Sequence, residues 1–283
     1  MQRVTSSKEL AQVLEHAKRE NLEVALVPTM GALHEGHLSL VAEARKHTPF
    51  VVVSIFVNPL QFGIGEDFDK YPRTIEEDAA KLEAIGVDVL YTPTVNDLYK
   101  SNMEITAHAG SIGDVLEGGD RLGHFDGVLT VVSRLFDAVK PKYAVFGQKD
   151  AQQVFLIKQM AKVDYPQIEI VIGPTIRDAN GLALSSRNVY LSEEELKAAT
   201  QISAALRAGK AASVASATGK IAAAVQTAET ALLAIPQAKL GYISLVDAKT
   251  FEPVLDDFEG PALLLAAVVV GKTRLIDNIE ITF

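Results

Sequence analysis

The chain contains no cysteine, no excess of basic residues and no apolar run long enough to span a membrane. The absence of cysteine excludes disulfides, thiolate nucleophiles and cysteine-ligated zinc. Lysine and arginine total 27 against 36 aspartates and glutamates, a formal net charge of −9, which argues against general binding to nucleic acid or anionic lipid. The strongest apolar run, residues 262–270, is too short for a bilayer. These features suit a soluble protein that acts on a small molecule.

What the chain does contain is enough apolar material for a large core. Its 283 residues are 48% hydrophobic, which excludes a disordered chain and permits one or two domains. The first nine residues have no apolar segment of the kind that a signal peptide needs. We therefore expect a cytoplasmic protein.

The first part of the chain alternates buried strands with amphipathic helices. Strands are expected over residues 24–27, 50–57, 87–91, 143–146 and 168–172, and helices over 6–18, 34–46, 75–85, 127–139 and 151–162. Such alternation predicts an α/β fold with a doubly wound, Rossmann-like parallel sheet. Ligands of such sheets bind at the carboxyl ends of the strands.

The pattern changes after residues 173–174, a Gly-Pro pair. Two alanine-rich helices are expected over 193–208 and 221–233, separated by the small-residue stretch 209–220. Strand-like runs follow at 242–246, 262–270 and 278–282. We therefore expect a Rossmann-like domain over residues 1–175 and a smaller α+β C-terminal domain with an antiparallel sheet over residues 176–283. The second domain is a candidate lid over the site.

The most informative segment is the turn after the first of these strands, Pro-Thr-Met-Gly-Ala-Leu-His-Glu-Gly-His at 28–37. A helix start offers unpaired N–H groups and the positive end of the helix dipole, which favour an anion. His34 and His37 are spaced to point to one side of it. They could instead be surface or capping residues, or share a metal ion, but they lack the spacing of a zincin. Phosphate binding is the preferred interpretation.

Two more polar clusters follow strands of the predicted sheet. Asn58 and Gln61 come after the second strand, and their neutral amides suit the hydroxyls and carboxylate of a small substrate. Residues 147–150, Gly-Gln-Lys-Asp, follow a later strand and open a helix. Lys149 there would meet a phosphate as a point charge, although a solvated lysine is common at such a position.

A third cluster, Leu-Ser-Ser-Arg-Asn at 184–188, lies just after the expected domain boundary. Its two hydroxyls and its permanently charged guanidinium offer several donors that could hold the far end of a triphosphate. Such a loop is also a common capping motif. Glu77 and Asp78 are adjacent acids in a helix, either a solvated face or a contact for magnesium at a nucleotide site.

Together these segments resemble the pantothenate synthetase (pantoate–β-alanine ligase) family. The matching pieces are residues 28–40, 54–63, 66–74, 123–132, 146–153 and 184–188, in order along both predicted domains. The resemblance places the family in the superfamily of nucleotidyltransferase-like proteins with a His-Ile-Gly-His turn, for which His34-Glu35-Gly36-His37 stands here. The second loop departs from that superfamily's lysine-rich Lys-Met-Ser-Lys-Ser pattern, because Arg187 stands in place of a lysine.

The resemblance implies a role for each matching residue. The implied ATP contacts are Met30, Gly31, Ala32, Leu33, His34, Glu35, Gly36, His37, Gly147, Gln148, Lys149, Asp150, Ile176, Leu184, Ser185, Ser186 and Arg187. The implied catalytic groups are His37, the proposed acid or hydrogen-bond donor, with His34, Lys149, Ser186 and Arg187. Gln61 and Gln153 would hold pantoate, Gln61 would also lie by the β-alanine site, and Asn58 would be its companion. Asp78 and Glu77 would contact Mg²⁺, although Lys81 follows where a neutral ligand could serve.

The implied reaction condenses pantoate with β-alanine through a pantoyl adenylate, with ATP and Mg²⁺, in a homodimer. Two alternatives remain open from the residues alone: a nucleotidyltransferase of the same fold and a non-catalytic ATP-binding regulator. The first would need an additional basic pocket for a phosphorylated acceptor. The second is disfavoured by the donors gathered for both ends of the phosphate chain.

Overall fold

The structure is a computed structural model that describes residues 1–63, 65–100 and 103–283. The chain divides into two compact units. The first unit comprises Met1–Gln148 with Gln152–Pro174, and the second unit comprises Lys149–Ala151 with Thr175–Phe283. Among the described helices, none has the length and apolar character to cross a membrane.

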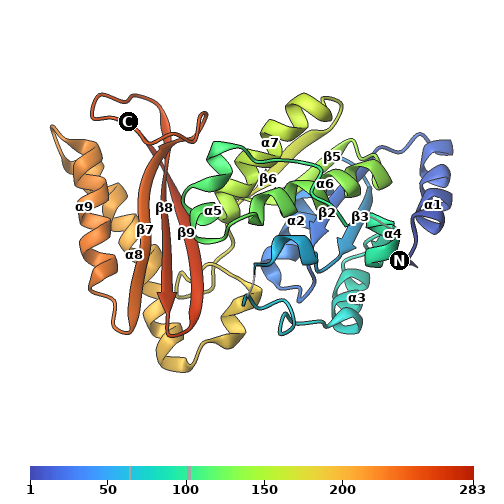
Figure 1. Cartoon of the computed structure of the whole chain (residues 1–283), viewed down its shortest axis with the longest axis horizontal. Helices are drawn as coiled ribbons and strands as arrows, with labels where there is room; N and C mark the ends of the chain where they lie inside the picture. The colour runs from blue at the N-terminus through green and yellow to red at the C-terminus, as the bar shows by residue number, and fades with distance from the viewer. Residues whose placement is uncertain (64, 101–102) are drawn as a thin grey trace. The chain divides into compact units, whose positions relative to one another are not determined.

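A six-stranded sheet forms the centre of the first unit (Figure 1). Its strand order is β1-β4-β3-β2-β5-β6 and every pairing is parallel. The strands are β1 (Gln2–Val4), β2 (Val24–Thr29), β3 (Phe50–Ile55), β4 (Val89–Tyr91), β5 (Tyr143–Gly147) and β6 (Glu169–Gly173). The carboxyl ends of β2, β3 and β5 therefore meet at one edge of the sheet, because neighbouring strands run in the same direction.

Helices cover both faces of this sheet. Along β2, Leu26 packs in the cluster that contains residues of α1 (Ser7–Arg19), α4 (Val95–Tyr99), α6 (His124–Val139) and α7 (Ala151–Asp164). Its neighbours Ala25 and Val27 pack in the opposite cluster with α2 (Glu35–Ala44) and α3 (Ile75–Ala84). Successive strand residues alternate between faces, so the doubly wound, Rossmann-like prediction is confirmed.

Several short elements of the first unit were not predicted. β1 and α4, with the four-residue α5 (Glu117–Asp120), span too few residues to show a period in the sequence. The helix expected from residue 127 begins at His124, one turn earlier. The position of Gly123, which precedes it with a φ of +76°, explains the earlier start, because glycine adopts the left-handed conformation without strain.

The second unit contains a three-stranded antiparallel sheet and two long helices. The strands β7 (Ala238–Asp247), β8 (Pro261–Val270) and β9 (Thr273–Thr282) pair in that order. Figure 1 shows α8 (Glu193–Ala215) and α9 (Lys220–Leu233) alongside them. Leu206 of α8 and Leu232 of α9 share a core with Leu264 of β8. The predicted α+β fold of this part is confirmed.

The predicted end of the first of these helices was wrong. α8 continues to Ala215, through the small residues expected to separate it from the next helix. A Cβ atom on Gly209 would lie 2.5 Å from the carbonyl oxygen of Ala224 and 2.9 Å from the Cβ of Ala228. The small residues therefore permit close packing of α8 on α9, and they do not mark a break.

This close approach predicts that Gly209→Ala destabilises the protein, although alanine favours a helix. The helix gains about 1 kcal/mol from the substitution, but crowding a packed interface costs about 1–3 kcal/mol; contact with a backbone oxygen puts this site at the upper end. We expect a net loss in the free energy of unfolding, measured by chemical denaturation of the full chain. Val214→Ala, an exposed position on the same helix, is the control. A more stable Gly209→Ala protein would contradict the close packing.

Candidate active site

The turn after β2 carries most of the predicted ATP-binding residues. The hydroxyl of Thr29 donates to the carbonyl oxygen of Ser54 on β3 at 2.8 Å and accepts from the N–H of Gly31 at 3.2 Å. Gly31 and Ala32 then adopt positive φ angles of 84° and 51°. A left-handed alanine costs about 1–2 kcal/mol. Contacts from elsewhere in the first unit must therefore hold the turn in this conformation.

Helix α3 supplies those contacts. The buried carboxylate of Asp78 accepts hydrogen bonds from the N–H of Ala32 at 2.8 Å and of Leu33 at 2.7 Å. The hydroxyl of Thr74 donates to the same carboxylate at 3.2 Å. The ammonium of Lys81 donates a hydrogen bond to the carbonyl oxygen of Leu33 at 2.7 Å. One helix thus binds the turn through both a carboxylate and an ammonium.

The two histidines cap the start of α2 reciprocally. His34 is the N-cap residue, and its Nδ1 accepts from the N–H of Gly36 at 3.1 Å. His37, three residues later, accepts from the N–H of His34 on its own Nδ1 at 3.3 Å. The ring centroids are 4.1 Å apart. A neutral imidazole that accepts at Nδ1 carries its proton on Nε2, so both rings have Nε2–H donors.

The backbone of the turn differs from the expectation that its N–H groups bind the anion. Six of these groups already donate to acceptors within the protein: those of Gly31, Ala32, Leu33, His34, Gly36 and His37. They hold the turn in shape and fix the orientation of the imidazoles. An anion at this turn would therefore meet side-chain donors more than backbone N–H groups.

Asn58 and Gln61 come together with Met30 at the same edge of the sheet. Asn58 caps the 3₁₀ turn η1 (Pro59–Gln61), and its Nδ2 donates to Gln61 Oε1 at 3.1 Å and to the carbonyl oxygen of Gly127 at 3.0 Å. Gln61 in turn donates from Nε2 to the sulfur of Met30 at 3.0 Å. The side chain of Asn58 is fully buried. Asn58 therefore orients Gln61.

The other end of the Asn58 amide is equally occupied. Its Oδ1 accepts from the N–H of Leu60 at 3.2 Å and from the hydroxyl of Tyr99 at 2.7 Å. Burial raises the pKa of Tyr99, so the phenol stays protonated and remains a donor. All the donor and acceptor positions normally used by a side-chain amide are filled, which makes Asn58 a rigid support.

A charged cluster next to the backbone carbonyl of Gln61 was not predicted from the sequence. Arg121 makes a two-point contact with Glu66, with Nε–Oε1 at 3.0 Å and Nη2–Oε2 at 2.6 Å. Its Nη1 lies 2.9 Å from Nε2 of His124, whose Nδ1 lies 2.8 Å from the carbonyl oxygen of Gln61. Because that carbonyl can only accept, His124 donates from Nδ1 and accepts from the guanidinium at Nε2. Residues 66–74 and 123–132 carried the resemblance, but no signal joined them.

The neighbouring glutamines of α7 have different environments. Gln152 is buried, donates to the carbonyl oxygens of Ile112 and Val115 at 2.7 and 2.9 Å, and accepts from the N–H of Glu117 at 3.1 Å. Gln153, the predicted pantoate ligand, is half-buried on the first turn of α7. The structure therefore gives Gln152 a supporting role and leaves the role of Gln153 a prediction.

Lys149 and the residues around it form a tight turn after β5. Gly147 ends β5 opposite Gly173 of β6, and Gln148–Asp150 form the 3₁₀ turn η3. The ammonium of Lys149 lies 3.5 Å from the Asp150 carboxylate. Lys149 and Asp150 belong to the second unit. Within that unit, the carbonyl oxygen of Lys149 accepts a hydrogen bond from Asn278.

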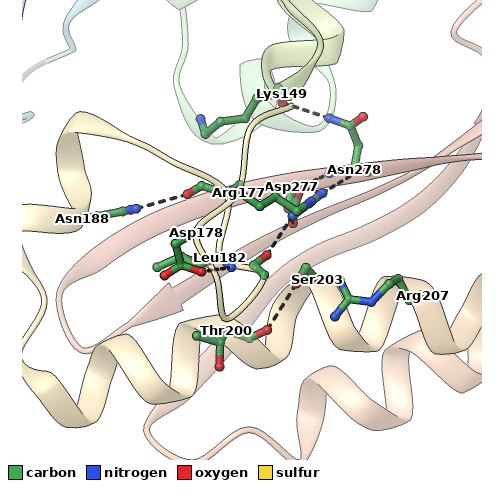
Figure 2. Close-up of polar contacts among 12 residues, drawn as sticks. Lys149, Arg177, Asp178, Leu182, Asn188, Thr200, Ser203, Arg207, Asp277 and Asn278 are labelled. Atoms are coloured by element: carbon green, nitrogen blue, oxygen red, sulfur yellow. Dashed lines mark hydrogen bonds and ion pairs between the residues drawn. The ribbon is translucent and has the colours of Figure 1, made fainter. Parts of the chain in front are cut away.

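Strand β9 holds Lys149 through an asparagine. Asn278 donates from Nδ2 to the carbonyl oxygen of Lys149 at 2.9 Å (Figure 2). Its neighbour Asp277, buried on the same strand, pairs with Arg177 through two hydrogen bonds of 2.6 and 2.8 Å. Arg177 also donates to the carbonyl oxygen of Gly181 at 3.2 Å. One buried ion pair thus connects β9 with the loop after Thr175.

That loop brings Ile176 together with the serine and arginine motif. The N–H of Leu184 donates to the carbonyl oxygen of Ile176 at 2.9 Å. Ser185 caps the 3₁₀ turn η4 (Ser186–Tyr190) by accepting from the N–H of Arg187 at 3.3 Å. The amide of Asn188 donates to Ala183 at 3.1 Å. In the second unit, therefore, the predicted backbone contacts at 176 and 184–187 lie in one hydrogen-bonded loop.

The predicted magnesium ligands do not fit a metal ion. Both oxygens of Asp78 already accept hydrogen bonds from N–H and O–H groups, and these three bonds use most of the acceptor positions that a carboxylate offers to a cation. Glu77 is exposed, whereas Asp78 beside it is buried. Lys81, on the same helix, brings an ammonium to the same turn. Throughout the described parts of the chain, moreover, no three histidine, aspartate or glutamate side chains form a metal-binding group.

Comparison with known proteins agrees with this geometry. The sequence model of the family described as pantoate-beta-alanine ligase matches residues 2–280. A pantothenate synthetase of Thermobifida fusca (strain YX) is 49% identical over 265 residues, covering 92% of this chain and 90% of the relative. The crystal structure of pantothenate synthetase from Thermus thermophilus covers 100% of both chains with a TM-score of 0.91 and 42% identity.

A further solved structure contains ligands. The pantoate-beta-alanine ligase of Francisella tularensis, described as complexed with beta-gamma ATP and beta-alanine, is 34% identical, with a TM-score of 0.79. The match covers 99% of this chain and 97% of that one. The family model and these relatives extend over nearly the whole chain, across both units. The chain belongs to the pantoate–β-alanine ligase family.

Proposed function

We propose that this chain condenses pantoate with β-alanine at the expense of ATP. A pantoate carboxylate oxygen attacks the α-phosphorus, the bond from that phosphorus to the bridging oxygen breaks, and pyrophosphate leaves. The amine of β-alanine then attacks the acyl carbon of the adenylate, loses a proton, and displaces AMP. The observation that carries the proposal is the reciprocally capped pair His34 and His37, in a chain of this family.

The histidine pair suits the first step because negative charge then grows on phosphoryl oxygens. A donor that is already oriented needs no reorganisation as that charge appears. The Nδ1 contacts of His34 and His37 fix both rings and direct the proton to Nε2. These two side chains bind phosphate oxygens in the proposed reaction, and His37 is the proposed acid or hydrogen-bond donor.

The other predicted residues complete the binding of substrates. Lys149, Ser186 and Arg187 provide a charge, a hydroxyl and a guanidinium for the phosphates. The remaining proposed ATP contacts are Met30, Gly31, Ala32, Leu33, Glu35, Gly36, Gly147, Gln148, Asp150, Ile176, Leu184 and Ser185. Gln61 and Gln153 hold pantoate, Gln61 also borders β-alanine, and Asn58 keeps Gln61 in its orientation through the 3.1 Å contact.

Magnesium enters this proposal with the nucleotide. ATP carries Mg²⁺ on its phosphate oxygens, which are the hard oxygen ligands that the ion prefers. In this proposal Asp78 and Glu77 do not ligate the ion: both oxygens of Asp78 accept hydrogen bonds from the turn, and Glu77 is exposed. No step above depends on an ion held by the protein.

Three properties belong to the proposal as a whole. The resemblance favours a homodimer, which sedimentation of the purified chain would test. The composition favours a cytoplasmic location. Residues 176–283 are proposed to shield the acyl adenylate from water, since that intermediate is lost to hydrolysis when exposed.

One assay tests the activity. The purified chain is incubated with ATP, Mg²⁺ and pantoate, then with β-alanine, while pyrophosphate, AMP and pantothenate are followed. We expect pyrophosphate with pantoate alone, and AMP together with pantothenate only after the amine is added. A product retaining the nucleotide would indicate a nucleotidyltransferase. ATP binding with no turnover would indicate a regulator, and either result would overturn the proposal.

A further inference from the structure

Helix α3 binds the peptide group that precedes the histidine pair. The peptide between Leu33 and His34 has its carbonyl oxygen bonded to the ammonium of Lys81 at 2.7 Å. The N–H of the same peptide donates to Nδ1 of His37 at 3.3 Å. Lys81 and His37 are thus joined through a single planar group, because C=O and N–H of one peptide bond rotate together.

Asp78 fixes the two preceding peptides from the same helix. Its carboxylate accepts from the N–H of Ala32 and from that of Leu33. The left-handed conformation of Ala32 is unfavourable by itself, so these hydrogen bonds to an anion, which are stronger than neutral ones, stabilise it. With Lys81, three successive backbone positions before the histidines are held by one helix.

The arrangement determines which nitrogen of His37 carries the proton. A cation on a carbonyl oxygen polarises the peptide and strengthens its N–H as a donor. A stronger donor at Nδ1 favours the tautomer with the proton on Nε2. The orientation of His37 then depends on a lysine that is bonded to the other side of the same peptide.

We propose that Lys81 and Asp78 are positioning residues that set the tautomer and orientation of His37 through the Leu33–His34 peptide. This inference rests on the proposed function only where it concerns rate, since the tautomer is a property of the protein without substrate. Asp78 and Lys81 thus bind the backbone of the turn, whereas the adjacent acids Glu77 and Asp78 alone would suggest a metal site.

Lys81 variants test the proposal, because Lys81 is exposed and its removal leaves the core intact. Lys81→Met removes the donor, Lys81→Arg restores a cationic donor, and Lys158→Met removes an exposed lysine on α7 as a matched control. Imidazole nitrogen chemical shifts of ¹⁵N-histidine-labelled protein report the tautomer, with His37→Gln identifying the signal. Pyrophosphate release measures adenylation, and the KM for β-alanine is measured separately.

In Lys81→Met we expect the Nδ1 signal of His37 to move toward the protonated type and adenylation to slow about tenfold, the size of one hydrogen bond to a charged group. The KM for β-alanine should stay unchanged, and Lys81→Arg should restore both readouts. Unchanged nitrogen shifts in Lys81→Met would overturn the positioning role. A shifted tautomer with an unchanged adenylation rate would uphold the positioning and contradict the proposed function of His37.

Asp78→Asn supplies an independent variant. An asparagine keeps one acceptor oxygen but turns an NH₂ group toward the second N–H, so one of the contacts to Ala32 and Leu33 is lost. We expect a larger loss of adenylation than in Lys81→Met, together with faster hydrogen exchange of the Ala32 and Leu33 amides. Exchange as slow as in the unaltered protein would overturn the role of Asp78.

Discussion

Replacing His37 with alanine is expected to slow adenylate formation about 10²- to 10³-fold, by analogy with the loss of one oxyanion-hole donor. The reason is that, in the proposed reaction, the Nε2–H of His37 donates to phosphoryl oxygens as their negative charge grows, while the backbone of the turn is already engaged. Six of its N–H groups have acceptors inside the protein. Release of pyrophosphate from ATP and pantoate, followed in the first turnover, measures the effect.

His37→Gln separates the two ways in which His37 could act. The glutamine amide offers a donor but cannot give up a proton at neutral pH. A rate near that of the unaltered protein would mean that His37 only donates a hydrogen bond, whereas a rate near that of His37→Ala would mean that it transfers a proton. His16→Ala, an exposed histidine on α1, serves as the control. Near-normal pyrophosphate release from His37→Ala would remove His37 from the mechanism.

Replacing Arg177 with methionine is expected to destabilise the protein by about 3–5 kcal/mol, the usual cost of leaving one member of a buried ion pair uncompensated. Asp277 is the more buried partner, with a side chain only 4% exposed. Without the guanidinium its charge loses two hydrogen bonds of 2.6 and 2.8 Å. Chemical denaturation of the full chain, followed by circular dichroism, measures the change in the free energy of unfolding.

A second substitution checks that the loss of stability comes from the unpaired carboxylate of Asp277. Arg177→Met combined with Asp277→Asn removes both charges, and we expect the double variant to recover a large part of the stability, as a double-mutant cycle would show. Lys249→Met, an exposed lysine in the same unit, should lie within about 0.5 kcal/mol of the unaltered protein. Equal losses in the single and double variants would contradict the explanation.

The fold and the location of the functional segments were predictable because both depend on local patterns. Short buried strands that alternate with helices predict a doubly wound sheet, and the position of the carboxyl ends of β2, β3 and β5 follows from it. Gly31 marked the turn where a positive φ is needed. The spacing of His34 and His37 indicated that they act as a pair.

The partners of these segments were not predictable because they are distant in sequence. Asp78 lies 46 residues from the Ala32 amide that it binds, and the Arg121–Glu66 contact spans 55. A sequence read without relatives shows that two acids are adjacent in a helix, but not which one faces the core. The carboxylates therefore suggested a metal, whereas the structure gives Asp78 two amides and Glu77 an exposed position.

The position of Asp277 and Asn278 on β9 also sets an order for events during synthesis. Every strand of the parallel sheet lies within residues 2–173, so that sheet can form while the rest of the chain is still being translated. Arg177 and the Lys149 carbonyl bond to residues made 100 and 129 positions later. Contacts of such long sequence separation form slowly, and their partners are synthesised well after the last strand of the parallel sheet. The parallel sheet can therefore form before the contact that supports Lys149 exists.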